Sequence, residues 1–394
     1  MTLKRYAAVL RPLLRPCVMV TLCFVVYRLT GTRQSEVVSD VHRRQYDSLG
    51  SDIVYPYKGS IFEPDYMYTN TTQSWLQRAN DLKLSSRQVS EQWLQKMHIR
   101  KQYVRDVCRK FNLSQTTLST DSLLVEARSK LLYCKVPKIA NTNWKRLLLG
   151  LAGVLKYSDF VRVKAKTIHY DLIPKHVKLL KQYTLIEREH VLKNYTKVMF
   201  IRNPLERLLS VYRNKIESKP YEHPEILSLV GNFVMSQYHG KKPGFPVHIK
   251  RAKDSVQGRM PSGENFEADL DNIPKLFPDV KITFEEFLRF ILDNPFRFNA
   301  HWAPFYVICT PCTIDYDFIG DFGTLVEDAE NILKVLNADP ELKYPSPELG
   351  KIPTASLMDE YYGHIPNDII VKIKTMYAVD LEMSLLVSKK GEVS

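Results

Sequence analysis

The chain has 394 residues, of which 44% are hydrophobic and 25% are charged. This composition is that of an ordinary globular protein, which excludes a chain too polar to bury a core, and the length allows one large α/β domain with an N-terminal extension. The formal net charge of +13 favours acidic partners and leaves nucleic acid, anionic membranes and acidic glycans as candidates.

Residues 1–29 predict a cytosolic tail followed by a signal-anchor helix. Basic residues precede the apolar run Cys17–Tyr27. This run is shorter than the roughly 20 residues of a full membrane span, but no small-residue cleavage site follows it, and Arg15 and Arg28 can extend to the two interfaces. The positive N-terminal side predicts a single-pass type II protein whose remainder is lumenal. The polar, aperiodic residues 30–90 then predict a lumenal stem.

Glycosylation triplets and cysteines agree with a secretory route. Acceptor triplets for N-glycosylation begin at Asn70, Asn112 and Asn194. Outside the apolar run there remain four cysteines, Cys108, Cys134, Cys309 and Cys312. An even number of cysteines in an oxidising compartment predicts disulfides, and the three pairings that four cysteines allow stay open. The spacing of Cys309 and Cys312 also matches half of a zinc site, but the sequence offers no second pair of ligands beside it.

The folded domain is expected to span residues 91–394 and to open with a basic helix near residues 90–111. Next, the apolar run Leu131–Val136 predicts a buried strand. The apolar positions that follow have helical spacing, at Trp144, Leu147, Leu148 and Leu151. Between strand and helix lies Lys138, at a corner where exposed N–H groups and the helix dipole favour bound phosphate.

A second corner of the same kind follows. Lys197–Ile201 predicts a strand, Asn203 is a favoured helix N-cap and Pro204 suits the first helical position. Arg202 ends the strand, and Ser210 lies two turns into the helix, away from its apolar stripe. Two such corners predict a ligand with two separate anionic groups. The phosphate loop GxxxxGK[ST] is absent, so the sequence does not support metal-triphosphate chemistry.

The C-terminal half completes the expected fold. Residues 220–278 have little pattern and predict an excursion over the active face. Asp317–Gly320 reads as a further strand, and capping boxes predict helix starts at Thr283 and Thr324, each followed three residues later by Glu. Alternating strands and helices predict an α/β fold with a P-loop-like parallel sheet flanked by helices.

Four blocks of the sequence resemble those of a known family. Tyr133–Arg146 is similar to the 5′-phosphosulfate loop of the Golgi carbohydrate sulfotransferases, and Phe200–Lys215 is similar to their 3′-phosphate motif. Phe298–Trp302 and Cys309–Gly320 resemble two further blocks of that family. The resemblance is to the group of the chondroitin/dermatan 4-O-sulfotransferases and the HNK-1 sulfotransferase.

The resemblance implies a Golgi membrane enzyme that transfers a sulfuryl group to a sugar hydroxyl. Its cosubstrate would be 3′-phosphoadenosine-5′-phosphosulfate (PAPS), with no metal. Lys138 would be catalytic, stabilising the bridging oxygen and the 5′-phosphate. The implied cosubstrate-binding residues are Pro137, Lys138, Thr142, Asn143, Trp144, Lys145, Arg202 and Ser210.

The implied acceptor is O4 of N-acetylgalactosamine in chondroitin or dermatan. The alternatives are an HNK-1-like glucuronate 3-hydroxyl, N-acetylgalactosamine on N-glycans, or an inactive glycan-binding homologue. The basic excess fits an acidic polymer, whose groove the cationic clusters Lys241-Lys242 and Lys250–Lys253 would line. The anchor and the glycosylation triplets argue against a nucleic-acid partner.

Sulfuryl transfer also needs a base for the proton of the acceptor hydroxyl, and histidine suits that role because its pKa is near neutral. His169 lies between the two corners, where the family carries such a residue, and is the first candidate. His176 stays open because the spacing there differs by a few residues. His301 is a third candidate, and the alternative interpretation is that it is buried and has only a structural role.

Three positions depart from the family pattern. Asn141 replaces the usual cysteine of the first motif, and Asn203 replaces an acidic residue beside Arg202. Gly323 stands where Glu is common. None of these changes removes Lys138, so we expect an active enzyme.

Overall fold

The computed structural model describes residues 89–113, 118–218, 223–240, 281–295, 299–345 and 352–389, all within one unit, residues 67–394. The expected anchor, nearly all of the expected stem, Asn70 and the clusters at 241–253 lie outside these ranges. Within them, no helix combines the length and the apolar character that a membrane crossing requires.

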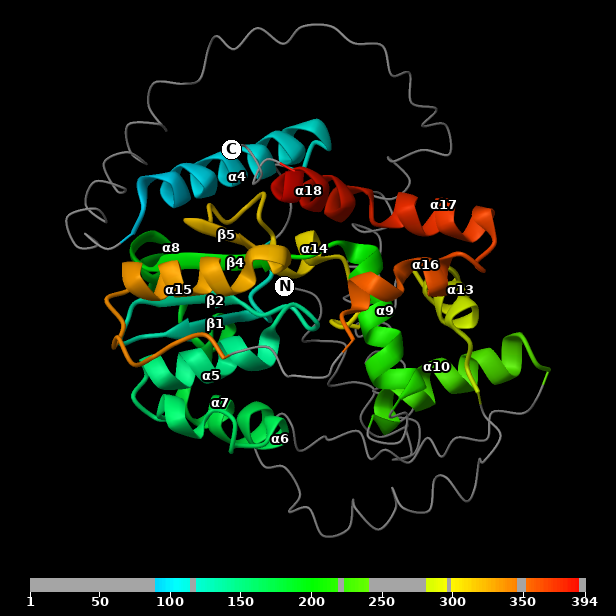
Figure 1. The fold of residues 1–394 in the computed structure, drawn as a ribbon, viewed down its shortest axis with the longest axis horizontal. Coiled ribbons are helices and arrows are strands. Elements are labelled where there is room, and N and C mark those ends of the chain that lie inside the picture. The colour runs from blue at the N-terminus through cyan, green and yellow to red at the C-terminus, as the bar shows by residue number, and fades with distance from the viewer. Residues whose placement is uncertain are drawn as a thin grey trace, which may run out of the picture. The chain divides into compact units, whose positions relative to one another are not determined.

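A five-stranded sheet with the order β3-β1-β2-β4-β5 forms the centre of the fold (Figure 1). Its strands are β1 Leu123–Glu126, β2 Leu131–Cys134, β3 Lys178–Leu179, β4 Thr196–Ile201 and β5 Phe318–Asp321. Strand β4 pairs in parallel with β2 on one side and with β5 on the other. All three of these strands therefore end at the same edge of the sheet.

The expectation of a parallel sheet is correct for β2, β4 and β5 and wrong for the other two strands. Strand β1 pairs antiparallel with both β2 and β3. The reason is the short turn between β1 and β2, because a connection of four residues can only reverse the chain. The Glu126 carboxylate stabilises this turn by accepting from the backbone N–H groups of Arg128 and Ser129, at 2.9 and 2.7 Å.

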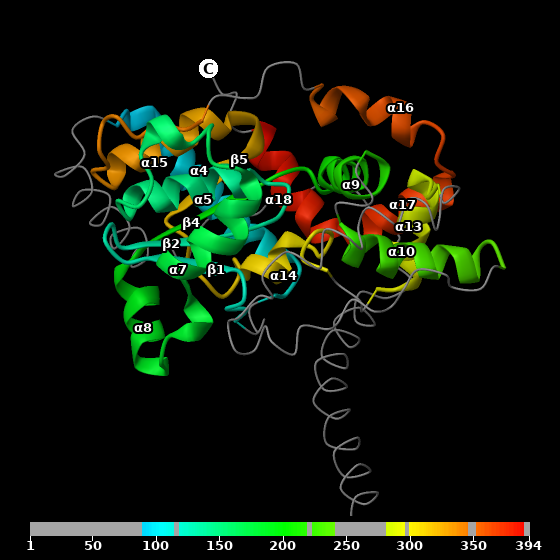
Figure 2. The ribbon, with the colours of Figure 1, turned by 90° about the horizontal axis from the view of Figure 1, so that it is seen from below.

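The helices form two groups. One accompanies the sheet: α4 Glu91–Lys110, α5 Asn141–Leu151, α6 Ala165–Thr167, the π-helix η2 Ile168–Leu172, α7 Ile173–His176, α8 Leu185–Asn194, α14 Phe305–Cys309, α15 Leu325–Val335 and α18 Ala378–Lys389. The other lies apart from the sheet in Figures 1 and 2: α9 Pro204–Tyr212, the π-helix η4 Arg213–Glu217, α10 Pro224–Gln237, α13 Phe284–Asp293, α16 Met358–Tyr362 and α17 Asn367–Met376. Short 3-10 turns are η1 Tyr157–Asp159, η3 Leu180–Gln182, η7 Phe322–Thr324 and η8 Thr354–Leu357.

Each group has its own apolar core. The first surrounds the sheet, where the buried Trp144 stacks on Tyr133 and contacts Phe200 at centroid distances of 4.8 and 5.1 Å. The second joins α9, α10, α13 and α17. Helix α9 begins directly after β4 and ends in the second core, so the edge of the sheet where β4 ends lies where the two cores adjoin.

Helices start at all three predicted caps. Asn203 accepts hydrogen bonds from the backbone of Leu205 and Glu206, with Pro204 at the first position of α9. Thr283 forms the expected capping box with Glu286. Thr324 is the N-cap of α15 as predicted, but its capping box is absent, because its hydroxyl donates instead to the buried Asp328, at 2.7 Å.

Two disulfides resolve the pairing that the sequence left open. Cys108 of α4 bonds to Cys312, and Cys134 at the end of β2 bonds to Cys309 at the end of α14. Cys309 and Cys312 are therefore bonded to other cysteines and are not free to ligate zinc. One disulfide thus ties the end of α14 to β2, and the other ties the segment after α14 to α4.

Candidate active site

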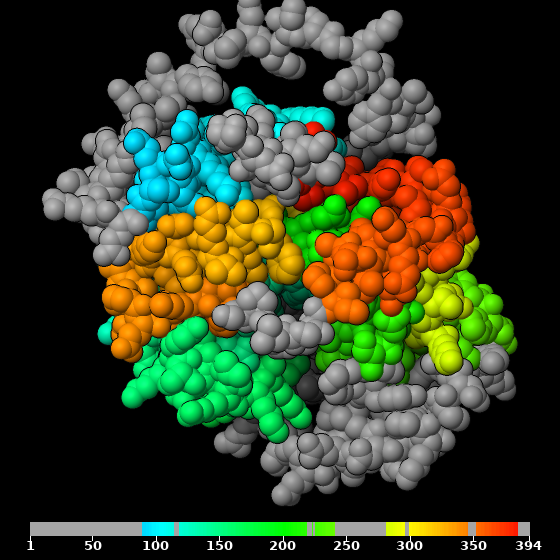
Figure 3. Space-filling model, in the orientation of Figure 1, coloured from blue at the N-terminus to red at the C-terminus, as the bar shows by residue number. Residues whose placement is uncertain are grey.

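The two predicted corners meet at one edge of the sheet. Because β2 and β4 are adjacent and parallel, the loops that leave their carboxyl ends emerge side by side. The guanidinium of Arg202 donates to the backbone carbonyl of Lys138 at 2.6 Å. In Figure 3 the surface is hollowed between α15 (orange) and α16 (orange-red), next to green atoms of α9.

The first corner is a helix start without a side-chain cap. Lys138 and Ala140 both adopt left-handed backbone, with φ of 69° and 51°. Ala140 stands at the N-cap of α5, where no side chain caps the helix and no acidic residue lies in the first turn. The first N–H groups of a helix have no intrahelical acceptor, so an uncapped N-terminus favours an anionic ligand. The ammonium of Lys138 lies beside this loop and donates to Asn214 at 3.1 Å.

The second corner differs, because its helix is capped by its own Asn203. Arg202 is buried, and its guanidinium also pairs with Glu206 at 2.6 Å. The same guanidinium stacks on the Phe322 ring, 4.1 Å from its centroid. Ser210 lies half-buried on α9. In the described part of the chain, the buried Nε atoms of Arg202 and Arg213 have no hydrogen-bond acceptor, so this corner too offers donors to an anion.

His169 links two residues of the first corner. Its Nε2 lies 2.8 Å from the Thr142 hydroxyl and its Nδ1 lies 2.7 Å from the ammonium of Lys145. Burial is the main cause that lowers the pKa of His169 to about 4, and the nearby charges of Lys145 and Lys215 contribute to the shift. Burial is also the main cause that lowers the pKa of Lys145 to about 7, with a smaller contribution from the charge of Lys135.

The other predicted residues of the first corner have structural partners. Asn143 accepts from Arg146 at 3.0 Å, and the Pro137 carbonyl accepts from Arg207 at 3.1 Å. The ring of Trp144 is fully buried. Its place in the core positions the start of α5, and a direct contact with a ligand stays a prediction.

The two alternative histidines differ in position. His176 is exposed at the C-terminal end of α7. His301 is half-buried and bonds to Asn299. Burial is the main cause that lowers the pKa of His301 to about 3, and the charges of Lys215, Arg207 and Lys138 contribute to the shift. Hydrogen bonds place both histidines near this edge of the sheet, because His169 contacts Thr142 in α5, and Arg207 joins Ala300, next to His301, to Pro137.

Sequence reasoning misses Arg207, which connects the site. This residue is only 1% exposed, and its fork donates to the carbonyls of Pro137, Ala300 and Ala303. A signal was present, because Arg207 stands at helical spacing with the buried Pro204 and Val211. An arginine on such a face must find acceptors within the core.

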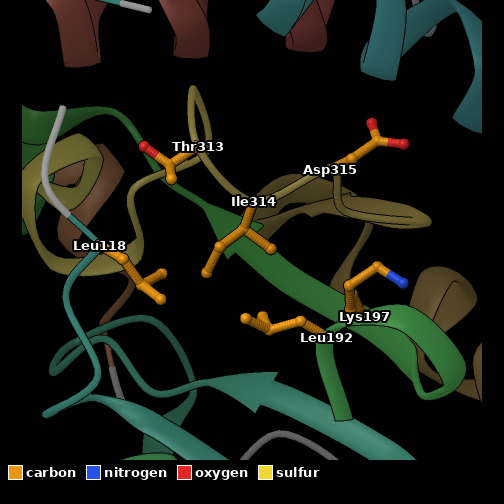
Figure 4. A pocket seen from close by; sticks show the side chains of 6 residues that line it. All are labelled: Leu118, Leu192, Lys197, Thr313, Ile314 and Asp315. Atoms are coloured by element: carbon orange, nitrogen blue, oxygen red, sulfur yellow. The ribbon is translucent and has the colours of Figure 1, made fainter. Parts of the chain in front are cut away.

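A separate pocket of about 280 Å³ lies elsewhere (Figure 4). It is lined by Leu118, Leu192, Lys197, Thr313, Ile314 and Asp315. Lys197 is near the start of β4, whereas Arg202 follows its end. The pocket therefore opens at the opposite edge of the sheet and shares no residue with the candidate site.

Comparison with known proteins agrees with the geometry. Residues 121–383 match the model of a family described as "Sulfotransferase family". The chain is 31% identical over 295 residues to carbohydrate sulfotransferase 11 of Rattus norvegicus, covering 72% of this chain and 74% of that protein. It is 32% identical over 265 residues to carbohydrate sulfotransferase 14 of Homo sapiens, covering 66% of this chain and 59% of that protein. No solved structure gives a significant match.

Proposed function

The chain belongs to the sulfotransferase family and is an enzyme that acts on carbohydrates. We propose that it transfers a sulfuryl group from PAPS to O4 of N-acetylgalactosamine in chondroitin or dermatan. The observation that carries the proposal is the meeting of two donor-rich corners at one edge of the sheet. A nucleotide with anionic groups on both its 3′ and 5′ sides matches two such corners.

Each corner has a distinct task in this proposal. The uncapped start of α5, with Lys138, Thr142 and Lys145, would hold the 5′-phosphosulfate. Arg202 and Ser210 would hold the 3′-phosphate, with the Nε of Arg213 as a further donor. PAPS supplies the activated sulfuryl group. The residues of this chain orient that group and stabilise the charge that develops on the leaving phosphate.

The charge of one surface segment supports an acidic polymer as the acceptor. Residues 156–181 contain seven lysines and arginines and two aspartates. Cations of this segment with exposed side chains include Lys156, Arg162, Lys164 and Lys166. The segment also includes His169, so an acidic glycan that followed it would pass the candidate site. Such a surface attracts sulfated and carboxylated chains through long-range electrostatics.

A Golgi location, with a type II anchor in residues 1–29, is part of the same proposal. Two disulfides between distant parts of the chain support an oxidising compartment. Asn112 and Asn194 are exposed, as an N-glycosylation site must be. Glycosidase sensitivity of the secreted lumenal domain, lost when Asn70→Gln, Asn112→Gln and Asn194→Gln are combined, would support lumenal placement.

The acceptor is tested directly. The lumenal domain is incubated with radiolabelled PAPS and, separately, desulfated chondroitin, desulfated dermatan and a glucuronate-capped oligosaccharide. We expect label in chondroitin or dermatan, with the labelled disaccharide carrying sulfate at O4 of N-acetylgalactosamine. Label confined to the glucuronate-capped oligosaccharide would reject the proposed acceptor and favour an HNK-1-like activity.

The titration of Lys145 predicts how pH affects cosubstrate affinity. Since burial lowers its pKa to about 7, the amine is charged below that pH and loses its charge above it. An anion favours the charged form, so affinity for adenosine 3′,5′-bisphosphate should fall as pH rises, by up to roughly tenfold between about pH 7 and 8. Calorimetry across this range measures the effect. The Lys145→Met variant should bind more weakly and with little pH dependence; an unchanged slope in that variant would contradict the assignment.

A further inference from the structure

The hydrogen bonds of His301 determine its tautomer. The backbone N–H of His301 donates to Oδ1 of Asn299 at 3.0 Å, and the same oxygen lies 2.7 Å from the ring Nδ1. A backbone N–H can only donate, so the Asn299 atom must be the carbonyl oxygen. That oxygen can only accept, so Nδ1 must bear the ring hydrogen. The lone pair of His301 is therefore on Nε2, which makes no hydrogen bond to any residue that the structure describes.

Both ring nitrogens of His169, in contrast, have hydrogen-bond partners. A charged Lys145 can only donate to Nδ1, so the ring hydrogen is on Nε2 and is donated to the Thr142 hydroxyl. If Lys145 is neutral, Nδ1 can donate to it, and Nε2 then accepts from Thr142. In either case both ring nitrogens are occupied, and no lone pair of His169 faces an incoming hydroxyl.

Arg207 holds His301 close to the first corner. Its three donated hydrogen bonds reach Pro137, in the loop of Lys138, and Ala300 and Ala303, which flank His301. The turn is also fixed from its other side, where the Tyr377 hydroxyl donates to the Trp302 carbonyl. The charge of Lys138 is near enough to lower the pKa of His301. Arg207 therefore ties the turn that carries His301 to the loop that carries Lys138.

We propose that His301 is the general base of the reaction and that Asn299 and Arg207 position it. The inference rests on the proposed sulfuryl transfer. In that step Nε2 of His301 takes the proton as the O–H bond of the acceptor breaks. The acceptor oxygen forms the new S–O bond, and the electron pair of the broken S–O bond leaves with the 5′-phosphate beside Lys138.

The same geometry gives His169 another task. When Lys145 is charged, Lys145, His169 and Thr142 form a chain of hydrogen bonds in which each member donates to the next, starting from this buried cation. The remaining hydroxyl hydrogen of Thr142 can then donate to an anion at the start of α5. His169 is in this view a positioning residue for cosubstrate binding and not a proton acceptor.

Matched variants separate the two roles. His301→Gln should lower kcat by about 10²- to 10⁴-fold, the range for loss of a general base, and leave the affinity for adenosine 3′,5′-bisphosphate unchanged. His169→Gln should weaken that affinity and lower kcat much less. His364→Gln, at an exposed position, is the control and should change neither. Added imidazole should restore part of the rate to His301→Ala, which a purely structural role of His301 does not predict.

The reverse pattern overturns the inference: His169→Gln loses turnover at full affinity, while His301→Gln keeps its turnover. Nitrogen-15 spectra of histidine-labelled protein give a second readout that needs no acceptor. They should show the Nδ1–H tautomer for His301 in the wild type, and an Nε2–H tautomer there would also overturn it. Wild-type protein that labels no glycan would reject the proposed function, and the spectra would still decide the tautomer.

Discussion

Replacing Lys138 by alanine should lower kcat by about 10²- to 10³-fold, the range for removal of one donor that stabilises developing charge. Lys138 belongs to the loop just before the uncapped start of α5, and its charge lowers the pKa of His301. The ammonium donates a hydrogen bond to the neutral side-chain oxygen of Asn214, at 3.1 Å. The fold should remain, since the side chain is only half-buried.

Lys130→Ala is the matched control for this variant. Lys130 also has left-handed backbone, with φ of 51°, but lies exposed in the β1–β2 turn. Any strain from alanine at positive φ is therefore common to both variants, whereas only Lys138 adjoins the site. Rates with radiolabelled PAPS and thermal melting by circular dichroism measure the two effects. Unchanged transfer by Lys138→Ala would reject its catalytic role.

Local sequence signals were sufficient to predict both corners. The apolar runs before Lys138 and Arg202 form β2 and β4, and Asn203 caps α9 as its residue type predicts. These features depend on neighbours within a few positions. Once β2 and β4 are parallel neighbours, the meeting of the two corners follows from the geometry of a sheet.

Features that depend on distant contacts were not predictable in this way. Strand β3 has only two residues, and its pairing with β1 joins segments far apart in the chain. Thr324 has the sequence of a cap, but its hydroxyl bonds to Asp328 because that buried carboxylate is close by. The tautomers of His169 and His301 depend on partners that no spacing rule reveals.

The largest effect on stability is expected at Asp328, which is fully buried. Its carboxylate pairs with the buried Arg100 at 2.7 Å and accepts from the Trp93 indole at 3.0 Å. It also accepts from the backbone N–H of Asp321 at 3.0 Å and from Thr324. Asp328→Ala should therefore lower the free energy of unfolding by about 3–5 kcal/mol, since it leaves the charge of Arg100 buried without its partner.

Glu285→Ala is the control, because Glu285 forms an exposed pair with Arg289 on α13. Its loss should lower the free energy of unfolding by no more than about 0.5 kcal/mol. Denaturant titrations of the three proteins compare the unfolding midpoints. Equal midpoints for the two variants would show that the buried pair adds no more than a surface pair.

Asp328→Ala should also weaken cosubstrate binding in the fraction of the protein that stays folded. Asp328 holds the turn from β5 into α15 through Asp321 and Thr324, and Phe322 lies between those two residues. The Phe322 ring in turn stacks on the guanidinium of Arg202, in the corner proposed to bind the 3′-phosphate. Calorimetry below the unfolding transition should show lower affinity for adenosine 3′,5′-bisphosphate than in Glu285→Ala. Equal affinities would mean that Arg202 is placed by Glu206 and the Lys138 carbonyl alone.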